Sequence, residues 1–368
     1  MVIYYQVKFV NRTEQNRTEQ NRTEQNRTEQ NRTEQNPYMD SFGRRAEFLV
    51  EDTQNISNYY GSLAPVGLVV YNRKNHTQKT IESLKNNTLA SETDLYIFSD
   101  AANKKEDEKA VNEVREYIRS VKDGFKNVYI FEADKNLGIK DSTVKAVNTI
   151  FEKHEFFIGL EDDIETNIYF LEFMNKALNY YKDDENIMAI TAFSHKHATK
   201  NYKHDIIFTY AFHSWGWGTW KSKWGDIDWN ECDISWYNKS LKHKIIGSVY
   251  SWFQLFAINK AVKNNYQIQS SLWDVYYSFA MYQRKKLCAW SSKFSFTNNI
   301  GFDGTGYHKY DFYNNYFESN LDKNIPEIKF TKYKSMNFFK YLIISLKIGI
   351  FSWCAGFITM FFSKFRDK

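Results

Sequence analysis

The sequence predicts an α/β fold in which helices flank a mostly parallel sheet. From Pro65 onward, short apolar runs alternate with segments whose apolar residues recur at helical spacing. Strands and helices that alternate in this way form parallel sheets. Polar residues directly follow several of the apolar runs, at the strand ends where such sheets bind ligands. With 368 residues, the chain is long enough to bury a large core.

The elements follow one another in a regular order. We predict strands at residues 66–70, 95–98, 128–131 and 156–160. We predict helices at 77–87, 104–122 and 142–153. After Phe208 the pattern changes to short aromatic segments, which we expect to form an aromatic-rich second half on the same sheet.

Composition limits the class of protein. Aromatic residues make up 18% of the chain, and the net charge is +5 with basic and acidic residues interspersed. No basic stripe for nucleic acid is present, whereas anionic ligands or an anionic membrane surface fit this charge. The cysteines Cys232, Cys288 and Cys354 have neither disulfide nor zinc spacing. We therefore expect a cytoplasmic protein without a secretory signal.

The N-terminal segment, residues 1–60, contains five perfect copies of Asn-Arg-Thr-Glu-Gln at positions 11–35. No apolar residue occurs in the copies, so we expect a disordered or solvated tract rather than a solenoid. The codons AAC AGA ACA GAA CAG encode this pentapeptide and also repeat the five-base unit AACAG. We hypothesise a DNA repeat whose slippage makes expression phase-variable; a flexible linker is the alternative.

The C-terminal segment is apolar. After a domain at 61–310 and a linker at 311–336, residues 337–368 are rich in Phe, Ile and Leu but include Lys340 and Lys347. A bilayer span needs about 20 apolar residues, and these lysines interrupt the run. We expect a C-terminal apolar helix in the membrane interface, at the inner face of the cytoplasmic membrane. A single span and a core helix are the alternatives.

Three consecutive carboxylates, Glu161, Asp162 and Asp163, end the apolar run that begins at Phe156. Desolvated carboxylates are costly unless they are paired or bound to metal, so we expect a divalent cation as partner. Alternation along a strand predicts Glu161 and Asp163 on one face and Asp162 on the other. An acidic turn without a ligand is the alternative.

These pieces in this order resemble the nucleotide-sugar domain of GT-A (Rossmann-like) glycosyltransferases. The resemblance covers residues 65–308 and is nearest to bacterial family 2-type and N-acetylglucosaminyltransferase I-like enzymes. It implies Asp163 as the ligand of Mn²⁺ or Mg²⁺. It also implies a set of nucleotide-sugar-binding residues at the strand ends: Tyr71, Asn72, Arg73, Asp100, Asn136, Gly138, Asp141, Glu161 and Asp162.

Two later segments extend the resemblance. The segment 213–220 contains Trp215, Gly216 and Trp217, which we expect to form an acceptor-binding site together with His308 at the end of a Gly-rich loop. The alternatives are a tryptophan-rich packing loop and a surface turn. Asp274, directly after a tryptophan, matches the catalytic base of the resembling enzymes. A helix cap is the alternative role for Asp274.

Together these features predict a metal-dependent, inverting glycosyltransferase of the hexosyltransferase class. We expect it to move a sugar from a nucleoside diphosphate donor, with a UDP-sugar as the expected one, to a cell-surface or lipid-linked glycan of lipooligosaccharide or capsule type. Oxygen ligands argue against zinc. A sugar-nucleotide nucleotidyltransferase and a non-catalytic membrane-attached carbohydrate-binding protein are the alternatives.

Overall fold

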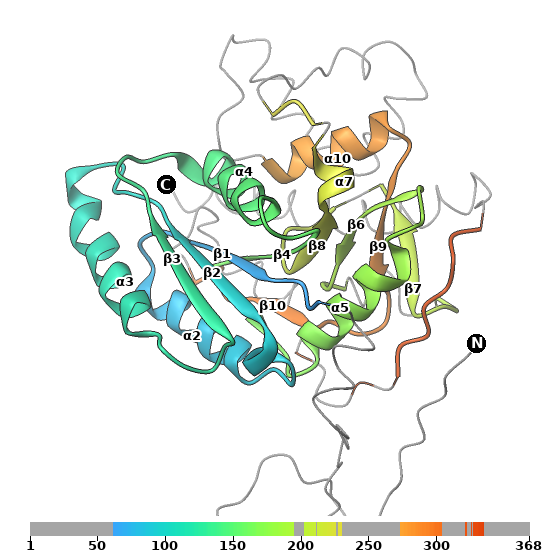
Figure 1. Cartoon of the computed structure of the whole chain (residues 1–368), viewed down its shortest axis with the longest axis horizontal. Helices are drawn as coiled ribbons and strands as arrows, with labels where there is room; N and C mark the ends of the chain where they lie inside the picture. The colour runs from blue at the N-terminus through green and yellow to red at the C-terminus, as the bar shows by residue number, and fades with distance from the viewer. Residues whose placement is uncertain are drawn as a thin grey trace, which may run out of the picture. The chain divides into compact units, whose positions relative to one another are not determined.

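The structure is a computed structural model that describes residues 62–194, 202–210, 212–225, 227–229, 273–303, 321, 325 and 327–334 (Figure 1). Contacts divide the chain into Met1–Gly61 and Ser62–Lys368, and every described residue belongs to the second unit. The repeat tract, His308 and the C-terminal segment 337–368 lie outside the described residues. Within the described ranges, no helix has the length and apolarity needed to cross a bilayer.

An eight-stranded sheet forms the centre of the fold, with the strand order β3-β2-β1-β4-β8-β6-β9-β7. Its members are β1 Val66–Val70, β2 Asp94–Ser99, β3 Asn127–Glu132, β4 Phe156–Glu161, β6 Ile187–Thr191, β7 Ile206–Thr209, β8 Trp217–Trp220 and β9 Leu287–Ser291. The pairings among β3, β2, β1 and β4 are all parallel, and β6 also pairs in parallel with β9. The predicted α/β fold with a mostly parallel sheet is confirmed, and it is consistent with a Rossmann-like arrangement.

Helices cover both faces of the sheet. They are α2 Lys74–Lys85, α3 Glu108–Ser120, α4 Gly138–Phe151, α5 Phe170–Tyr181, α7 Lys221–Trp224 and α10 Trp273–Gln283. Short 3-10 turns lie at Ala90–Glu92 and Lys105–Asp107. Figure 1 shows α4 and α10 on one side of the sheet and α2, α3 and α5 on the other. Because both faces are covered, β1 is buried along its whole length, which explains its uninterrupted apolar sequence.

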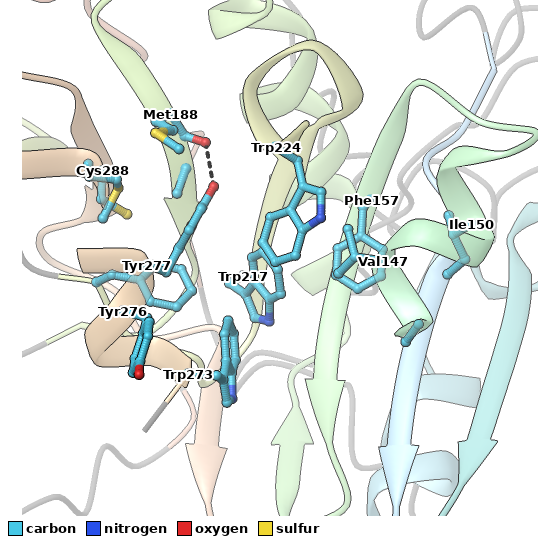
Figure 2. Close-up of a cluster of buried hydrophobic side chains, with 14 of the residues drawn as sticks. Val147, Ile150, Phe157, Met188, Trp217, Trp224, Trp273, Tyr276, Tyr277 and Cys288 are labelled. Carbon is cyan, nitrogen blue, oxygen red and sulfur yellow. Dashed lines mark hydrogen bonds between the residues drawn. The ribbon is translucent and has the colours of Figure 1, made fainter. Parts of the chain in front are cut away.

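The aromatic second half continues the same sheet. Strand β8 lies between β4 and β6 and is antiparallel to both. Its Trp217 packs at the centre of an aromatic cluster, with ring centroids 5.0 Å from Phe157 and 5.1 Å from Trp273 (Figure 2). A Cβ atom on Gly159 would lie 2.2 Å from the Trp217 indole nitrogen. The glycine in β4 therefore makes room for this tryptophan.

A second, two-stranded sheet lies beside the acidic residues. Strand β5, Ile164–Thr166, follows them after a tight turn and pairs antiparallel with β10, Thr297–Asn299. This pairing brings the residues after β10 next to the carboxyl end of β4, although the two segments are far apart in the sequence.

Candidate functional site

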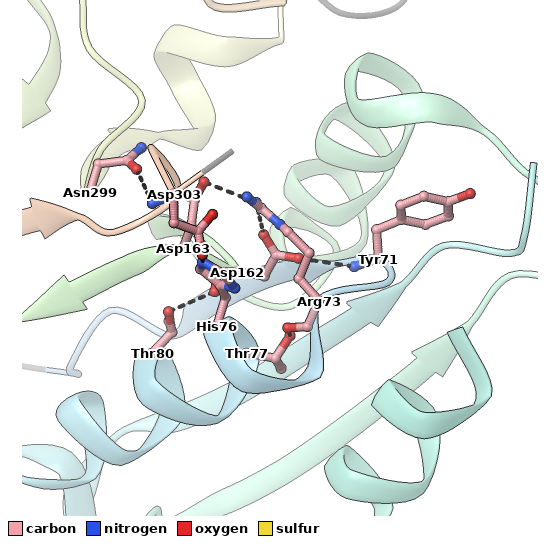
Figure 3. Close-up of polar contacts among 10 residues, drawn as sticks. Tyr71, Arg73, His76, Thr77, Thr80, Asp162, Asp163, Asn299 and Asp303 are labelled. Carbon is pink, nitrogen blue, oxygen red and sulfur yellow. Dashed lines mark hydrogen bonds and ion pairs between the residues drawn. The ribbon is translucent and has the colours of Figure 1, made fainter. Parts of the chain in front are cut away.

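The acidic turn, defined here as residues 161–163, lies at the carboxyl end of β4 beside the end of β1 (Figure 3). Arg73 follows β1, and its carbonyl oxygen accepts the Thr77 N–H at 2.9 Å in the first turn of α2. Its Nη2 atom contacts Asp162 Oδ1 and lies 2.9 Å from Asp163 Oδ2. The expectation that Asp162 and Asp163 face opposite ways is wrong. The strand ends at Glu161, so its alternation does not extend to the next two residues, and both reach the same guanidinium.

Each of the three carboxyl groups has a different environment. Burial raises the pKa of Glu161 to about 8, and the negative charges of Asp163 and Asp274 add to that increase. Burial also raises the pKa of Asp162, whereas the positive charge of Arg73 acts to lower it. In the structure the Arg73 guanidinium is the partner of Asp162 and Asp163. The cation expected at this turn stays a prediction.

Asp163 retains one oxygen that fits a cation. Its Oδ1 atom is buried and, within the described part of the chain, has no hydrogen-bond partner. Among those same residues, no group of three His, Cys, Asp or Glu side chains is arranged to hold a metal. Mg²⁺-type ions are often held by one or two carboxylates together with substrate phosphates and water. Asp163 can therefore contribute one ligand of Mn²⁺ or Mg²⁺, with the other ligands coming from a bound diphosphate and solvent.

Asp274 lies near the acidic turn. It occupies the first turn of α10, and its charge is close enough to raise the pKa of Glu161. The neighbouring Trp273 hydrogen-bonds the Glu161 side chain and is itself 2% exposed. The fold thus brings the proposed base and the acidic turn together, although β4 and α10 are distant in the sequence.

The segment after β10 closes over Asp163. The Ile300 N–H donates to the Asp163 carbonyl oxygen at 2.9 Å, and the Gly301 N–H donates to Asn299 Oδ1 at 2.7 Å. Asp303 lies 3.2 Å from His76 Nε2 on α2. The contact of this Gly-rich segment with Asp163 has no local signature in the sequence, because it depends on the β5–β10 pairing.

Asp100, Asn136 and Gly138 also come together. Asp100 is 6% exposed, and its carboxylate accepts the backbone N–H groups of Leu137 and Gly138, each at 2.9 Å. Asn136 Nδ2 donates to the same carboxylate at 3.1 Å. Asp100 therefore caps the start of α4, and Gly138 supplies the positive φ of 75° that this turn requires. Its predicted contact with a uracil or ribose stays a prediction.

The remaining predicted nucleotide contacts have different surroundings. The Tyr71 hydroxyl donates to Asp107 Oδ2 at 2.9 Å, and the Tyr71 N–H donates to Asp162 Oδ2 at 3.4 Å. Asn72 is half-buried beside Arg73. The Asp141 side chain is 58% exposed and lies 3.4 Å from Lys140 Nζ. Tyr71 thus borders the acidic turn, whereas Asp141 is largely exposed at the start of α4.

The predicted acceptor residues divide into two groups. Trp215 is half-buried, and its ring centroid lies 4.6 Å from Phe193 and 5.6 Å from Phe302. Gly216 has a φ of 77°, and a Cβ atom there would lie 2.5 Å from Thr297 Cγ2. Trp217 is 1% exposed, so the expectation that it stacks on an acceptor is wrong. Trp217 occupies β8, whose four residues are all buried, and its ring packs against Phe157, Trp224 and Trp273.

Comparison with known proteins leaves the family open. No protein-family model matches the chain, and no curated protein matches it at a significant level. Among solved structures, S. aureus TarS matches over 70% of this chain and 41% of its own, at 11% identity and a TM-score of 0.37. The chain thus spans about two fifths of the length of that structure. A TM-score this low assigns neither a family nor an activity.

Proposed function

We propose that this chain is a cation-dependent, inverting glycosyltransferase that uses a nucleoside diphosphate-sugar, with a UDP-sugar as the expected donor. The observation that supports it most is the position of Asp274 beside Glu161 and the acidic turn. Inversion needs a base on the acceptor side and stabilisation of the leaving diphosphate on the other. In this proposal, the start of α10 supplies the base. The carboxyl ends of β1 and β4, which lie beside it, supply the groups that stabilise the diphosphate.

The roles follow from the environment of each group. Asp163 Oδ1, buried and without a partner within the described residues, would hold Mn²⁺ or Mg²⁺. Such an ion, when bound, neutralises charge that develops on a departing diphosphate. Asp274 takes the proton of the attacking acceptor hydroxyl. Glu161, whose pKa burial raises, orients the donor, and Trp215 contributes an aromatic face for the acceptor.

Turnover tests this proposal directly. Purified full-length chain is incubated with a panel of nucleotide-sugars, with Mn²⁺ or with chelator, and release of the nucleoside diphosphate is measured. We expect cation-dependent release that Asp274→Asn abolishes while nucleotide binding, measured by calorimetry, persists. Asp183→Asn, an exposed carboxylate in the turn after α5, is the matched control and should retain turnover.

Three outcomes would contradict the proposal. Full turnover by Asp274→Asn would remove this residue from the role of base. Exchange of pyrophosphate into a nucleoside triphosphate, without sugar transfer, would favour a nucleotidyltransferase. Sugar binding without any cation-dependent uptake of nucleotide would favour a non-catalytic carbohydrate-binding protein.

The acceptor and the place of action belong to the same proposal. We expect a cell-surface or lipid-linked glycan acceptor at the inner face of the cytoplasmic membrane, with residues 337–368 in the membrane interface. Co-sedimentation with anionic vesicles tests the membrane attachment, using a variant in which Lys340 and Lys347 are both changed to Glu.

The gene sequence tests phase variation: synonymous codons mixed across residues 11–35 would contradict a DNA repeat.

A further inference from the structure

The Arg73 side chain is enclosed by the acidic turn. It is 18% exposed, and the side chains of Asp162 and Asp163 are 7% and 11% exposed. Burial by itself lowers the pKa of Arg73, but the two carboxylates more than compensate and raise it above its ordinary value. The guanidinium is therefore permanently charged. A planar guanidinium is suited to hold two carboxylates at once, which a point-like ammonium does less well.

The position of Arg73 is closed from the other side by the segment after β10. A Cβ atom on Gly301 would lie 2.1 Å from Asp163 Oδ2 and 2.9 Å from Arg73 Nη1. Figure 3 shows Arg73 between the acidic turn and the start of α2, with Asn299 and Asp303 on the far side of Asp163. In the structure the guanidinium therefore lies between the two carboxylates and the segment after β10.

The two oxygens of Asp163 differ in their availability. Oδ2 is engaged by Arg73 at 2.9 Å, whereas Oδ1 is buried without a partner in the described ranges. A divalent cation on Oδ1 would share a carboxylate with the guanidinium. Two positive charges that share one carboxylate in a partly buried site repel each other more strongly than they would in water.

We propose that Arg73 is a built-in counterion that competes with the divalent cation for Asp162 and Asp163. In the cation-free chain, Arg73 stabilises the acidic turn. Cation binding weakens or breaks the Arg73–Asp163 contact, so the cation alone binds less tightly than the two aspartates would allow. This inference rests on the cation site of the proposed function. It makes Arg73 a positioning residue that sets the affinity of the site.

Arg73 could instead help the cation to bind, and its removal would then change the cation affinity in the opposite direction. If Arg73 only orients Asp163 for the cation, removing it would loosen the turn and weaken cation binding. The sign of the change in affinity therefore distinguishes a competitor from an orienting residue.

Titration with Mn²⁺ alone, followed by calorimetry on the full-length chain, tests the inference. We expect Arg73→Gln to bind Mn²⁺ about tenfold or more tightly than wild type, which corresponds to about 1.4 kcal/mol. Lys74→Gln removes an equal charge from the next residue, which is exposed, and should stay within about twofold of wild type. Adding Asp163→Asn to Arg73→Gln should abolish the gain. A gain below about tenfold, no gain, or no binding by any variant overturns the inference.

A measurement on wild type keeps the test valid if Arg73→Gln does not fold. Hydrogen exchange of the Arg73 guanidinium, followed by NMR, should accelerate when diamagnetic Mg²⁺ is added, because the ion releases the side chain to solvent. Exchange that is unchanged at saturating Mg²⁺ overturns the inference.

The outcomes separate this inference from the proposed function. Cation-dependent sugar transfer with no tighter Mn²⁺ binding by Arg73→Gln would contradict the competition but leave the glycosyltransferase proposal standing. Tighter Mn²⁺ binding without transfer to any acceptor would support the competition and contradict the enzyme assignment.

Discussion

Gly301 lies so close to Asp163 that a Cβ atom on the glycine would fall 2.1 Å from Oδ2 of the carboxylate. The adjacent Ile300 N–H donates to the Asp163 carbonyl oxygen at 2.9 Å. The backbone after β10 therefore binds the main chain of Asp163 and packs against its side chain. The surroundings of the acidic turn thus include a segment that is distant in the sequence.

Gly301→Ala should disturb the acidic turn. The added methyl group must push Asp163 away from Arg73, at a cost of about 1–3 kcal/mol typical of overpacking. We expect a lower free energy of unfolding in urea and a loss of Mn²⁺-dependent UDP binding in calorimetry. Gly225→Ala is the matched control, because its φ is −62° and the nearest atom to a Cβ is 3.8 Å away. Wild-type UDP binding by Gly301→Ala would contradict the prediction.

Asp100→Asn should destabilise the start of α4. The carboxylate accepts N–H groups from Leu137 and Gly138, and an amide nitrogen in place of one oxygen would face a donor. A buried donor without an acceptor costs about 1–3 kcal/mol, which urea unfolding would detect. Asp183→Asn, at an exposed position, should change stability by less than about 0.5 kcal/mol. Equal stabilities for the two variants would show that the cap is not needed.

Stability in the presence of a chelator should depend on pH through Glu161. Burial raises its pKa in the folded chain from 4.5 to about 8. Between these values the folded state keeps a proton that the unfolded state has lost, so this contribution is complete below the lower pKa and is lost as pH rises through the higher one. Urea unfolding from about pH 5 to about pH 8 should show wild type losing stability relative to Glu161→Gln. Parallel curves for the two proteins would refute this assignment.

Trp217 and Trp215 should respond differently to truncation. Trp217 is 1% exposed at the centre of the aromatic cluster, and Trp217→Ala should cost about 3–5 kcal/mol in urea unfolding. Trp215 is half-buried, so Trp215→Ala should cost clearly less and act mainly on binding of the acceptor. If Trp217→Ala were as stable as Trp215→Ala, the core position of Trp217 would be wrong.

Local patterns were sufficient to predict the parallel half of the fold. Each strand from β1 to β4 begins and ends within one residue of its predicted bounds. Strands β1, β2 and β4 are buried along most of their length, which requires an apolar run. Strand β3 is only partly buried, but its sequence still contains the apolar run that predicted it. Helix α4 begins at Gly138, four residues before the prediction, since its first turn is set by the Asp100 carboxylate. That interaction joins two separate loops and has no local signature.

The sequence by itself determined the order of the strands and helices in the first half and the placing of carboxylates at the strand ends, because both follow from apolar periodicity along the chain. Only the tertiary structure decided that Arg73 is the partner of Asp162 and Asp163, that Gly301 packs on Asp163, and that Trp217 is buried in the core. Each of these contacts joins residues from different elements, and it forms only when packing places those elements side by side.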